Sequence, residues 1–118
     1  MNGFRILLLI LLLAVVGYTV PVVINHGFGL FGVFFGDIGQ MAWPGQFNFD
    51  FLGFLVLSGT WMAWRNNFSP FGLLLGVGGI VGGIPLLATY LLIESKRVDD
   101  DWMALVFGPK RAQQLRRS

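Results

Sequence analysis

The side chains of this 118-residue chain that could do chemistry at a membrane are one histidine and three carboxylates, His26, Asp37, Asp50 and Glu94. A carboxylate at the centre of a membrane-spanning helix costs about 3 kcal/mol on insertion scales, so an acid at membrane depth is the first place to look for function. All three carboxylates lie near predicted membrane edges, where this cost is much smaller. If the segment between them folds back, Asp37 and Asp50 could approach each other and bind a cation or transfer a proton.

The histidine lacks the companions that a metal site needs. His26 has no second histidine and no carboxylate at ligand spacing, and the chain contains no cysteine. Because metal sites normally use three or four such groups, we predict that His26 lies at the membrane surface and that the chain has no metal site. The glycines between Gly76 and Gly79 lie in a hydrophobic tract without a following Lys-Ser or Lys-Thr, so they make a poor nucleotide-binding loop. The sequence assigns no catalytic residue and identifies no cofactor.

The composition indicates a membrane protein. Hydrophobic residues make up 55% of the chain and charged residues only 12%, and the mean hydropathy is +0.72. Typical soluble domains carry about 25% charged residues. We therefore expect a helical membrane domain over residues 1–97 and a cytoplasmic basic tail over residues 98–118. The lipid bilayer is the first partner of such a chain, and the sequence contains no module for binding nucleic acid.

The tract from Phe71 to Glu94 is apolar and carries no charge before its last residue. A helix over residues 71–93 would be about 35 Å long, enough to cross a hydrocarbon core of about 30 Å. We therefore predict a membrane-spanning helix here. Pro85 lacks the N–H that would bond to the carbonyl of Val81, so a kink is expected at this point.

Six glycines of this tract form two stripes on the predicted helix. Gly72, Gly76, Gly79 and Gly83 share one face, and Gly78 and Gly82 share a second. Small residues allow a neighbouring backbone to approach closely, which drives helix association in lipid. One stripe could be covered within the chain while the other serves a partner, or all six could fit the chain's own helices together.

Two further spans are predicted. Residues 6–24 are apolar over a length that can cross the bilayer, and no small-x-small cleavage site follows, so we expect a retained helix and not a removed signal peptide. Residues 49–64 form a shorter span of about 24 Å, which follows a turn at residues 44–48. Arg65 and the tryptophans before it are expected to anchor the end of this span at the membrane surface.

The segment 28–43 alternates glycine with phenylalanine and fits a helix with one small face and one aromatic face. With Asp37 near its middle it is short and polar for a span, which favours an interfacial or re-entrant helix. The predicted fold class is therefore an all-α membrane protein with three membrane-spanning helices, this interfacial helix and a short C-terminal amphipathic helix. Four spans result if the segment crosses the bilayer.

The C-terminal segment opens with three aspartates, which suit the start of a short helix over residues 102–107. Gly108 and Pro109 end this helix, and a basic tail follows. Because basic residues near membrane ends stay in the cytoplasm, we predict a multi-pass protein of the cell inner (plasma) membrane with a cytoplasmic C-terminus. Three spans place six basic residues on the side of the tail and two on the other, whereas four spans divide them seven to one.

A loose pattern runs through the middle of the chain at the following positions: Asn25, Gly27, Phe49, Asp50, Trp61, Gly83, Pro85, Leu86, Tyr90 and Glu94. This order of residues resembles a group of small bacterial membrane proteins, an uncharacterised family known as a domain of unknown function. The resemblance covers about residues 25–94. It implies a bacterial inner-membrane location and about three spans, and it implies no activity.

Three function classes follow from these observations. The first is a non-catalytic accessory or assembly subunit that packs on itself, or on a larger membrane complex, through the glycine faces of residues 71–93. The second is a small oligomeric transporter or channel. The third is a membrane enzyme that uses Asp37, Asp50 and His26 at the membrane surface. The first class is expected, because the sequence offers packing surfaces and no catalytic motif.

Overall fold

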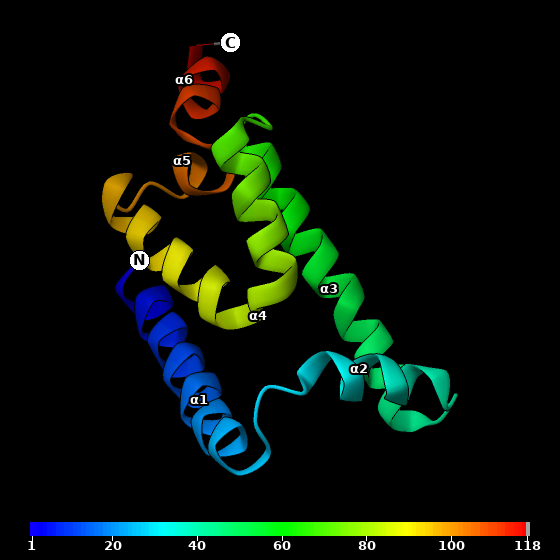
Figure 1. The fold of residues 1–118 in the computed structure, drawn as a ribbon. Helices are drawn as coiled ribbons and strands as arrows, with labels where there is room; N and C mark the ends of the chain where they lie inside the picture. The colour runs from blue at the N-terminus through cyan, green and yellow to red at the C-terminus, as the bar shows by residue number, and fades with distance from the viewer. Residues whose placement is uncertain (118) are drawn as a thin grey trace.

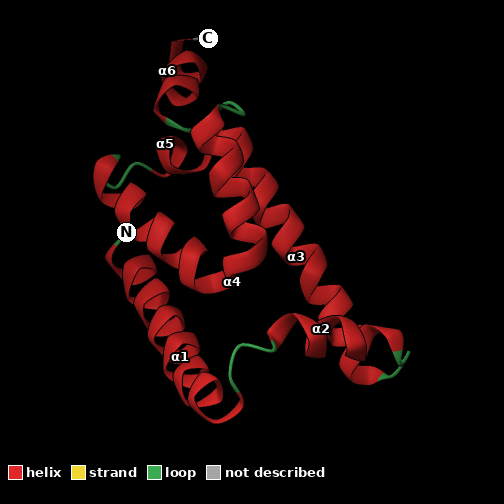
Figure 2. Cartoon of the chain, in the orientation of Figure 1, coloured by secondary structure: helices red, strands yellow, loops and turns green. Residues whose placement is uncertain are grey.

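The computed structural model describes residues 1–117 and is all helical over that range, as the sequence predicts (Figure 2). Six helices follow one another along the chain: α1 (Asn2–His26), α2 (Leu30–Gly39), α3 (Trp43–Arg65), α4 (Pro70–Arg97), α5 (Trp102–Phe107) and α6 (Pro109–Arg117). The molecule is elongated, with extents of 52 × 26 × 25 Å. Taken as unbroken helices, α1 and α4 are long and apolar enough to cross a membrane, whereas α3 is long enough but more polar.

The helix α4 is broken in its middle. Gly83 has φ 60° and ψ −142°, a backbone conformation that only glycine adopts readily. Pro85 follows two residues later and cannot donate a backbone hydrogen bond. The two residues together divide α4 into a first half (residues 70–82) and a second half (residues 84–97), each about 20 Å long. The kink predicted near Pro85 is therefore present, with the break itself at Gly83.

The second half of α4 turns back at the break and runs toward α5 and the start of α1 (Figure 1). Near the break, Gly83 faces Leu55 of α3. Further on, the rings of Tyr90 and Trp61 lie 6.0 Å apart, and Glu94 lies 3.3 Å from Arg65, the last residue of α3. A straight helix of 28 residues would instead separate its ends by about 40 Å. The helix predicted over residues 71–93 is therefore present, but it bends back at Gly83 into a helical hairpin. The prediction rested on the length of the apolar tract, and this length does not reveal whether the chain reverses at a glycine.

The first half of α4 packs tightly against α3. A Cβ added to Gly76 would meet the Gly59 carbonyl oxygen at 3.0 Å, and one added to Gly72 would meet the Ala63 carbonyl oxygen at 3.1 Å. These approaches are too close for most side chains. The absence of side chains at these positions lets the two backbones come together, as small-residue faces do in membrane helices.

The helix α3 begins earlier than predicted. Residues 44–48, expected as a turn between elements, belong to the start of the helix. Pro44 is its second residue, and at this position the missing N–H of proline costs nothing. The helix α2 is shorter than the predicted 28–43 and ends at Gly39. Asn48 of α3 donates to the Phe34 carbonyl oxygen at 3.2 Å, which fixes α2 against the start of α3.

The C-terminal segment folds back onto the other helices. The predicted short helix over residues 102–107 is confirmed as α5, and residues 110–117 of the expected basic tail belong to α6, while Ser118 lies outside the described residues. A small apolar core forms around Leu105, Ala104, Val98 and Ala112, with Phe4 of α1 packed against it.

Two ends of the molecule can now be named. The polar end consists of the start of α1, the last turns of α3 and α4, and the helices α5 and α6 (Figure 1). The elbow end consists of α2 and residues 40–50, where α2 meets the start of α3. The C-terminal end of α1 also points away from the polar end.

Candidate functional site

Arg65 is buried at the centre of the polar end, with 6% of its surface exposed. Its guanidinium donates from Nη1 to the Tyr90 hydroxyl at 2.8 Å, and its Nη2 lies 3.3 Å from a carboxylate oxygen of Glu94. Asn66 donates to the same Tyr90 hydroxyl at 2.9 Å. The end of α3 is thus joined to the second half of α4 by a buried, hydrogen-bonded ion pair.

The side chains of α3 and α6 also complete the backbone hydrogen bonding of α5. The last four carbonyl groups of a helix have no partner inside it. In α5 these belong to Ala104, Leu105, Val106 and Phe107, of which Ala104 also accepts from the backbone N–H of Gly108 at 2.9 Å. Arg65 donates to the first two at 3.3 and 2.6 Å, the indole N–H of Trp61 to the third at 3.1 Å, and Arg111 to the fourth at 3.4 Å. A helix of only six residues is held in place by these donors.

The start of α1 is attached to the same cluster. Arg5 donates from Nε to the Ser95 hydroxyl and from Nη2 to the Ser95 carbonyl oxygen, both at 3.0 Å, and it pairs with Asp100. The rings of Phe4 and Trp102 lie 5.0 Å apart. Five helices, α1, α3, α4, α5 and α6, therefore meet at the polar end through arginine side chains.

Asp101 links α5 to α6 at the surface of the polar end. Its carboxylate accepts from the backbone N–H of Met103 at 3.1 Å and pairs with Arg116 at 2.6 Å. The hydrogen bond from Arg116 lowers the pKa of Asp101 below its ordinary value of 3.8, and Asp101 in turn raises the pKa of Arg116. Both side chains stay charged at neutral pH and hold the two short helices together.

The residues at the centre of this cluster, which we call the clamp, hold helices together: they are Arg65, Asn66, Tyr90 and Glu94. A guanidinium carries several N–H donors in a fixed plane and no acceptor, so Arg65 can bind several oxygen atoms at once. No buried side-chain nitrogen or oxygen within residues 1–117 lacks a hydrogen-bond partner. A buried ion pair whose polar atoms are all bonded fixes the relative positions of helices, and removing one partner leaves an uncompensated charge.

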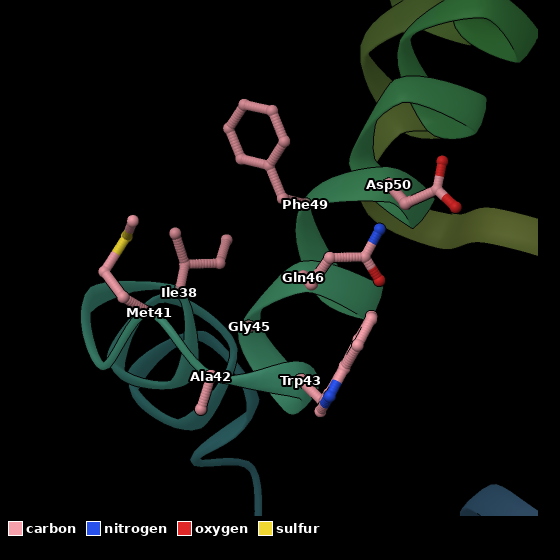
Figure 3. Close-up of a pocket in the computed structure, with 8 residues that line it drawn as sticks. All are labelled: Ile38, Met41, Ala42, Trp43, Gly45, Gln46, Phe49 and Asp50. Carbon is pink, nitrogen blue, oxygen red and sulfur yellow. The ribbon is translucent and has the colours of Figure 1, made fainter.

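The elbow end carries an open cavity of about 880 Å³ (Figure 3). Eight residues line it: Ile38, Met41, Ala42, Trp43, Gly45, Gln46, Phe49 and Asp50. Gly45 lies against the Asp37 carbonyl, so that a side chain there would collide with the backbone of α2. The elbow is thus fixed by a close backbone crossing, and its lining is mainly apolar with one amide and one carboxylate.

The four predicted polar residues do not form one site. Glu94 lies at the polar end and pairs with Arg65 at 3.3 Å and Arg97 at 3.1 Å. Asp37 and Asp50 lie at the elbow end, where Asn48 donates to Asp37 at 3.5 Å. In the described part of the chain, no hydrogen bond or ion pair joins His26, Asp37 and Asp50 to one another, and no metal-ligating cluster occurs.

Both predicted glycine stripes face parts of the same chain. Gly72, Gly76 and Gly79 are buried against α3, and Gly83 forms the break in α4. The nearest side chain to both Gly78 and Gly82 is that of Leu86, on the other side of the break. The chain's own packing thus covers the first stripe, whereas Gly78 is half-buried and Gly82 is exposed, so the second stripe is only partly covered.

The residues at the centre of the clamp were not identified from the sequence as a site. Arg65 was expected as an anchor at the membrane surface, and its partner Tyr90 was noted in the pattern that resembles a family of small membrane proteins. One signal was present: Glu94 ends a long tract without charge, and a carboxylate there needs a cation. Nothing in the spacing indicates which of the eight basic residues supplies it.

Comparison with known proteins gives no match: no family model, no curated protein and no solved structure is similar to the chain at a significant level. The resemblance to small bacterial membrane proteins over residues 25–94 therefore stays a prediction. Function is argued below from the residues and their geometry.

Proposed function

We propose that the chain is a multi-pass protein of the bacterial inner membrane in which α1 and α3 cross the bilayer. In this proposal α4 enters from the cytoplasmic side and returns to it, and both termini are cytoplasmic. The lengths are consistent: α1 and α3 are about 37 and 34 Å long, whereas each half of α4 is about 20 Å and too short to cross a core of about 30 Å.

The distribution of basic residues supports this topology. All eight lie in elements of the polar end: Arg5, Arg65, Lys96, Arg97, Lys110, Arg111, Arg116 and Arg117. Two crossing helices and a re-entrant hairpin place all eight on one side, whereas three crossings divide them six to two. Because basic residues are retained in the cytoplasm, the eight-to-none arrangement satisfies the positive-inside rule best.

Within the membrane, we propose a non-catalytic role as an accessory or assembly subunit that associates with a second copy or with a larger membrane complex. The observation that carries this proposal is the exposure of α1. Leu8 is its one buried residue, and Phe4 and Arg5 near its start contact the C-terminal segment and α4. Apolar side chains along the rest of α1, such as Leu13 at 69% exposure, are free to contact a partner helix.

The associating surface differs from the one expected from the sequence. The first glycine face of α4 is covered by α3, and Leu86 lies against the second, which leaves less free surface there than on α1. An exposed apolar helix is the surface that remains, and packing of its side chains against another helix would supply the dispersion contacts that stabilise membrane complexes.

Photo-crosslinking in native membranes tests this role. A photoreactive residue at Leu13 is expected to give one discrete protein adduct, either a dimer of the chain or a complex with one partner. The same residue at Leu8, which is 5% exposed, is the matched control and should give no intermolecular adduct. Adducts with lipid alone from Leu13 would contradict the accessory role.

A transporter or channel is the second candidate, and the broken helix favours it. Transporters often build their substrate sites where discontinuous helices end inside the membrane, and the break at Gly83 would lie at such a depth. This candidate requires ion or solute flux in vesicles that falls when Asp50 is replaced by Asn. Flux that is absent, or unchanged in the variant, would remove it.

A further inference from the structure

We propose that the cavity at the elbow end binds a phospholipid with a primary ammonium headgroup, such as phosphatidylethanolamine, from the leaflet opposite the polar end. The ammonium would donate to the Asp50 carboxylate, and an acyl chain would lie against the apolar lining. The inference rests on the proposed membrane placement, because only then does the elbow lie at the level of lipid headgroups.

The cavity has the size and composition of a ligand site. Its volume of about 880 Å³ falls within the range of about 300–1,000 Å³ that is usual for small-molecule sites. Ile38 and Met41 come from α2 and the turn after it, and Phe49 from α3 (Figure 3). These three side chains offer an apolar wall suited to hydrocarbon.

Asp50 is the charged group of this cavity, and its carboxylate has no hydrogen bond or ion pair within residues 1–117. All eight basic residues belong to elements of the polar end, so the chain supplies no cation near it. A carboxylate near the membrane surface with no internal counter-ion is complementary to the ammonium group of a zwitterionic headgroup. Anionic lipids are disfavoured by the same charge.

Trp43 and Gln46 extend the site along α3. Their side chains and that of Asp50 project from the same side of the helix, as the spacing of three and four residues requires (Figure 3). The rings of Trp43 and Phe47 lie 6.2 Å apart at the start of this stripe. Aromatic faces attract cations, and the Gln46 amide can donate to a phosphate oxygen or accept from an ammonium.

The carboxylate selects a primary ammonium over a quaternary one. A primary ammonium carries three N–H donors, which make short charge-assisted hydrogen bonds to a carboxylate, whereas a choline headgroup carries none. Phosphatidylethanolamine should therefore bind better than phosphatidylcholine with the same acyl chains, and phosphatidylglycerol should bind least.

The test is binding of these three lipids to the purified full chain in detergent, measured by native mass spectrometry. We expect a preference for phosphatidylethanolamine over phosphatidylcholine of roughly tenfold, the size of one charge-assisted hydrogen bond. Asp50→Asn should remove the preference. Asp99→Asn is the matched control at the polar end, because Asn tolerates the φ of 53° found at Asp99, and it should leave the preference intact.

Equal binding of all three lipids, or a preference that survives Asp50→Asn, would overturn the proposal. Trp43→Leu provides a second variant, which should weaken phosphatidylethanolamine binding without disturbing the ion pairs of the polar end. Because these measurements are made in detergent, they do not depend on the direction of insertion or on a protein partner. Failure of the proposed topology or accessory role would instead appear in labelling and crosslinking in membranes.

Discussion

The polar end and the elbow end of this molecule differ in whether their charged side chains have partners within the chain. At the polar end, Arg65 is buried among Glu94, Tyr90 and the carbonyl oxygens of α5, and each of its three guanidinium nitrogens has a partner. At the elbow end, Asp50 is one of the residues that line an open, mainly apolar cavity, and its carboxylate has no partner in the described residues. The buried charge of the polar end is thus paired within the chain, whereas the carboxylate of Asp50 at the elbow end is not.

This difference indicates which end holds the fold together and which meets other molecules. Buried, fully bonded charges fix helix positions and lose stability when one partner is removed. Uncovered apolar surface around a free carboxylate contributes little to folding and remains available for lipid. Substitutions at the polar end should therefore act on stability, and substitutions at the elbow end should act on binding.

The largest effect is expected for Arg65→Leu. The substitution leaves Glu94 without its buried partner and removes the donors to two carbonyl groups of α5, so the free energy of unfolding in detergent should fall by about 3–5 kcal/mol. Arg117→Ala, on the exposed face of α6, is the control and should change it by less than about 0.5 kcal/mol. Equal, small effects for both would show that the polar end is not the clamp described here.

A smaller loss is expected where the two backbones of α3 and α4 touch. Gly59→Ala places a methyl group against the Gly76 carbonyl, and overpacking of this kind costs about 1–3 kcal/mol. Gly17→Ala is the matched control on α1, where nothing lies within 4 Å and a better helix former should be neutral or stabilising. Thermal unfolding of the two variants in the same detergent compares them, and similar midpoints would contradict the tight α3–α4 contact.

The smallest effect concerns the surface pair between Asp101 and Arg116. The pKa of Asp101 is lowered in the folded chain, so the pair stabilises the docked α6 above the ordinary pKa of 3.8 and loses this contribution as the pH falls through the folded value. Proteolysis of α6 should therefore increase in acid. Asp101→Asn should be more easily cleaved at neutral pH and should show a weaker acid dependence, and an unchanged pH profile in this variant would assign the effect to other groups.

The all-α class, the apolar character of α1 and α4 and the short helix after the three aspartates could be predicted from the sequence, because they follow from composition, length and helix-end chemistry. The hairpin could not be predicted in the same way. A tract of 23 apolar residues satisfies the length rule whether it runs straight or reverses, and the choice depends on one backbone angle at Gly83 and on contacts with residues far along the chain. Pro85 correctly predicted the region in which α4 bends, but it did not predict how large the change in helix direction would be.

The same limit applies to the candidate sites. Asp50 was recognised because a carboxylate in an apolar context stands out from the sequence alone. Arg65 was not recognised as buried, because its surroundings are assembled from α4 and α5, which lie 25 to 40 residues away. The end of a helix can look like a membrane anchor from its composition alone. It can nevertheless be buried in the folded chain when a later segment packs over it, as α5 packs over Arg65.

Cysteine labelling from one side of the membrane tests the central claim most directly, and the natural chain has no cysteine to interfere. Ser69→Cys and Lys96→Cys place thiols just before α4 and near its end. In intact cells with an outer membrane made permeable, we predict that neither reacts with a membrane-impermeant maleimide, whereas Met41→Cys at the elbow end does. Labelling of one α4 variant and not the other would show that α4 crosses the bilayer and would contradict the hairpin topology.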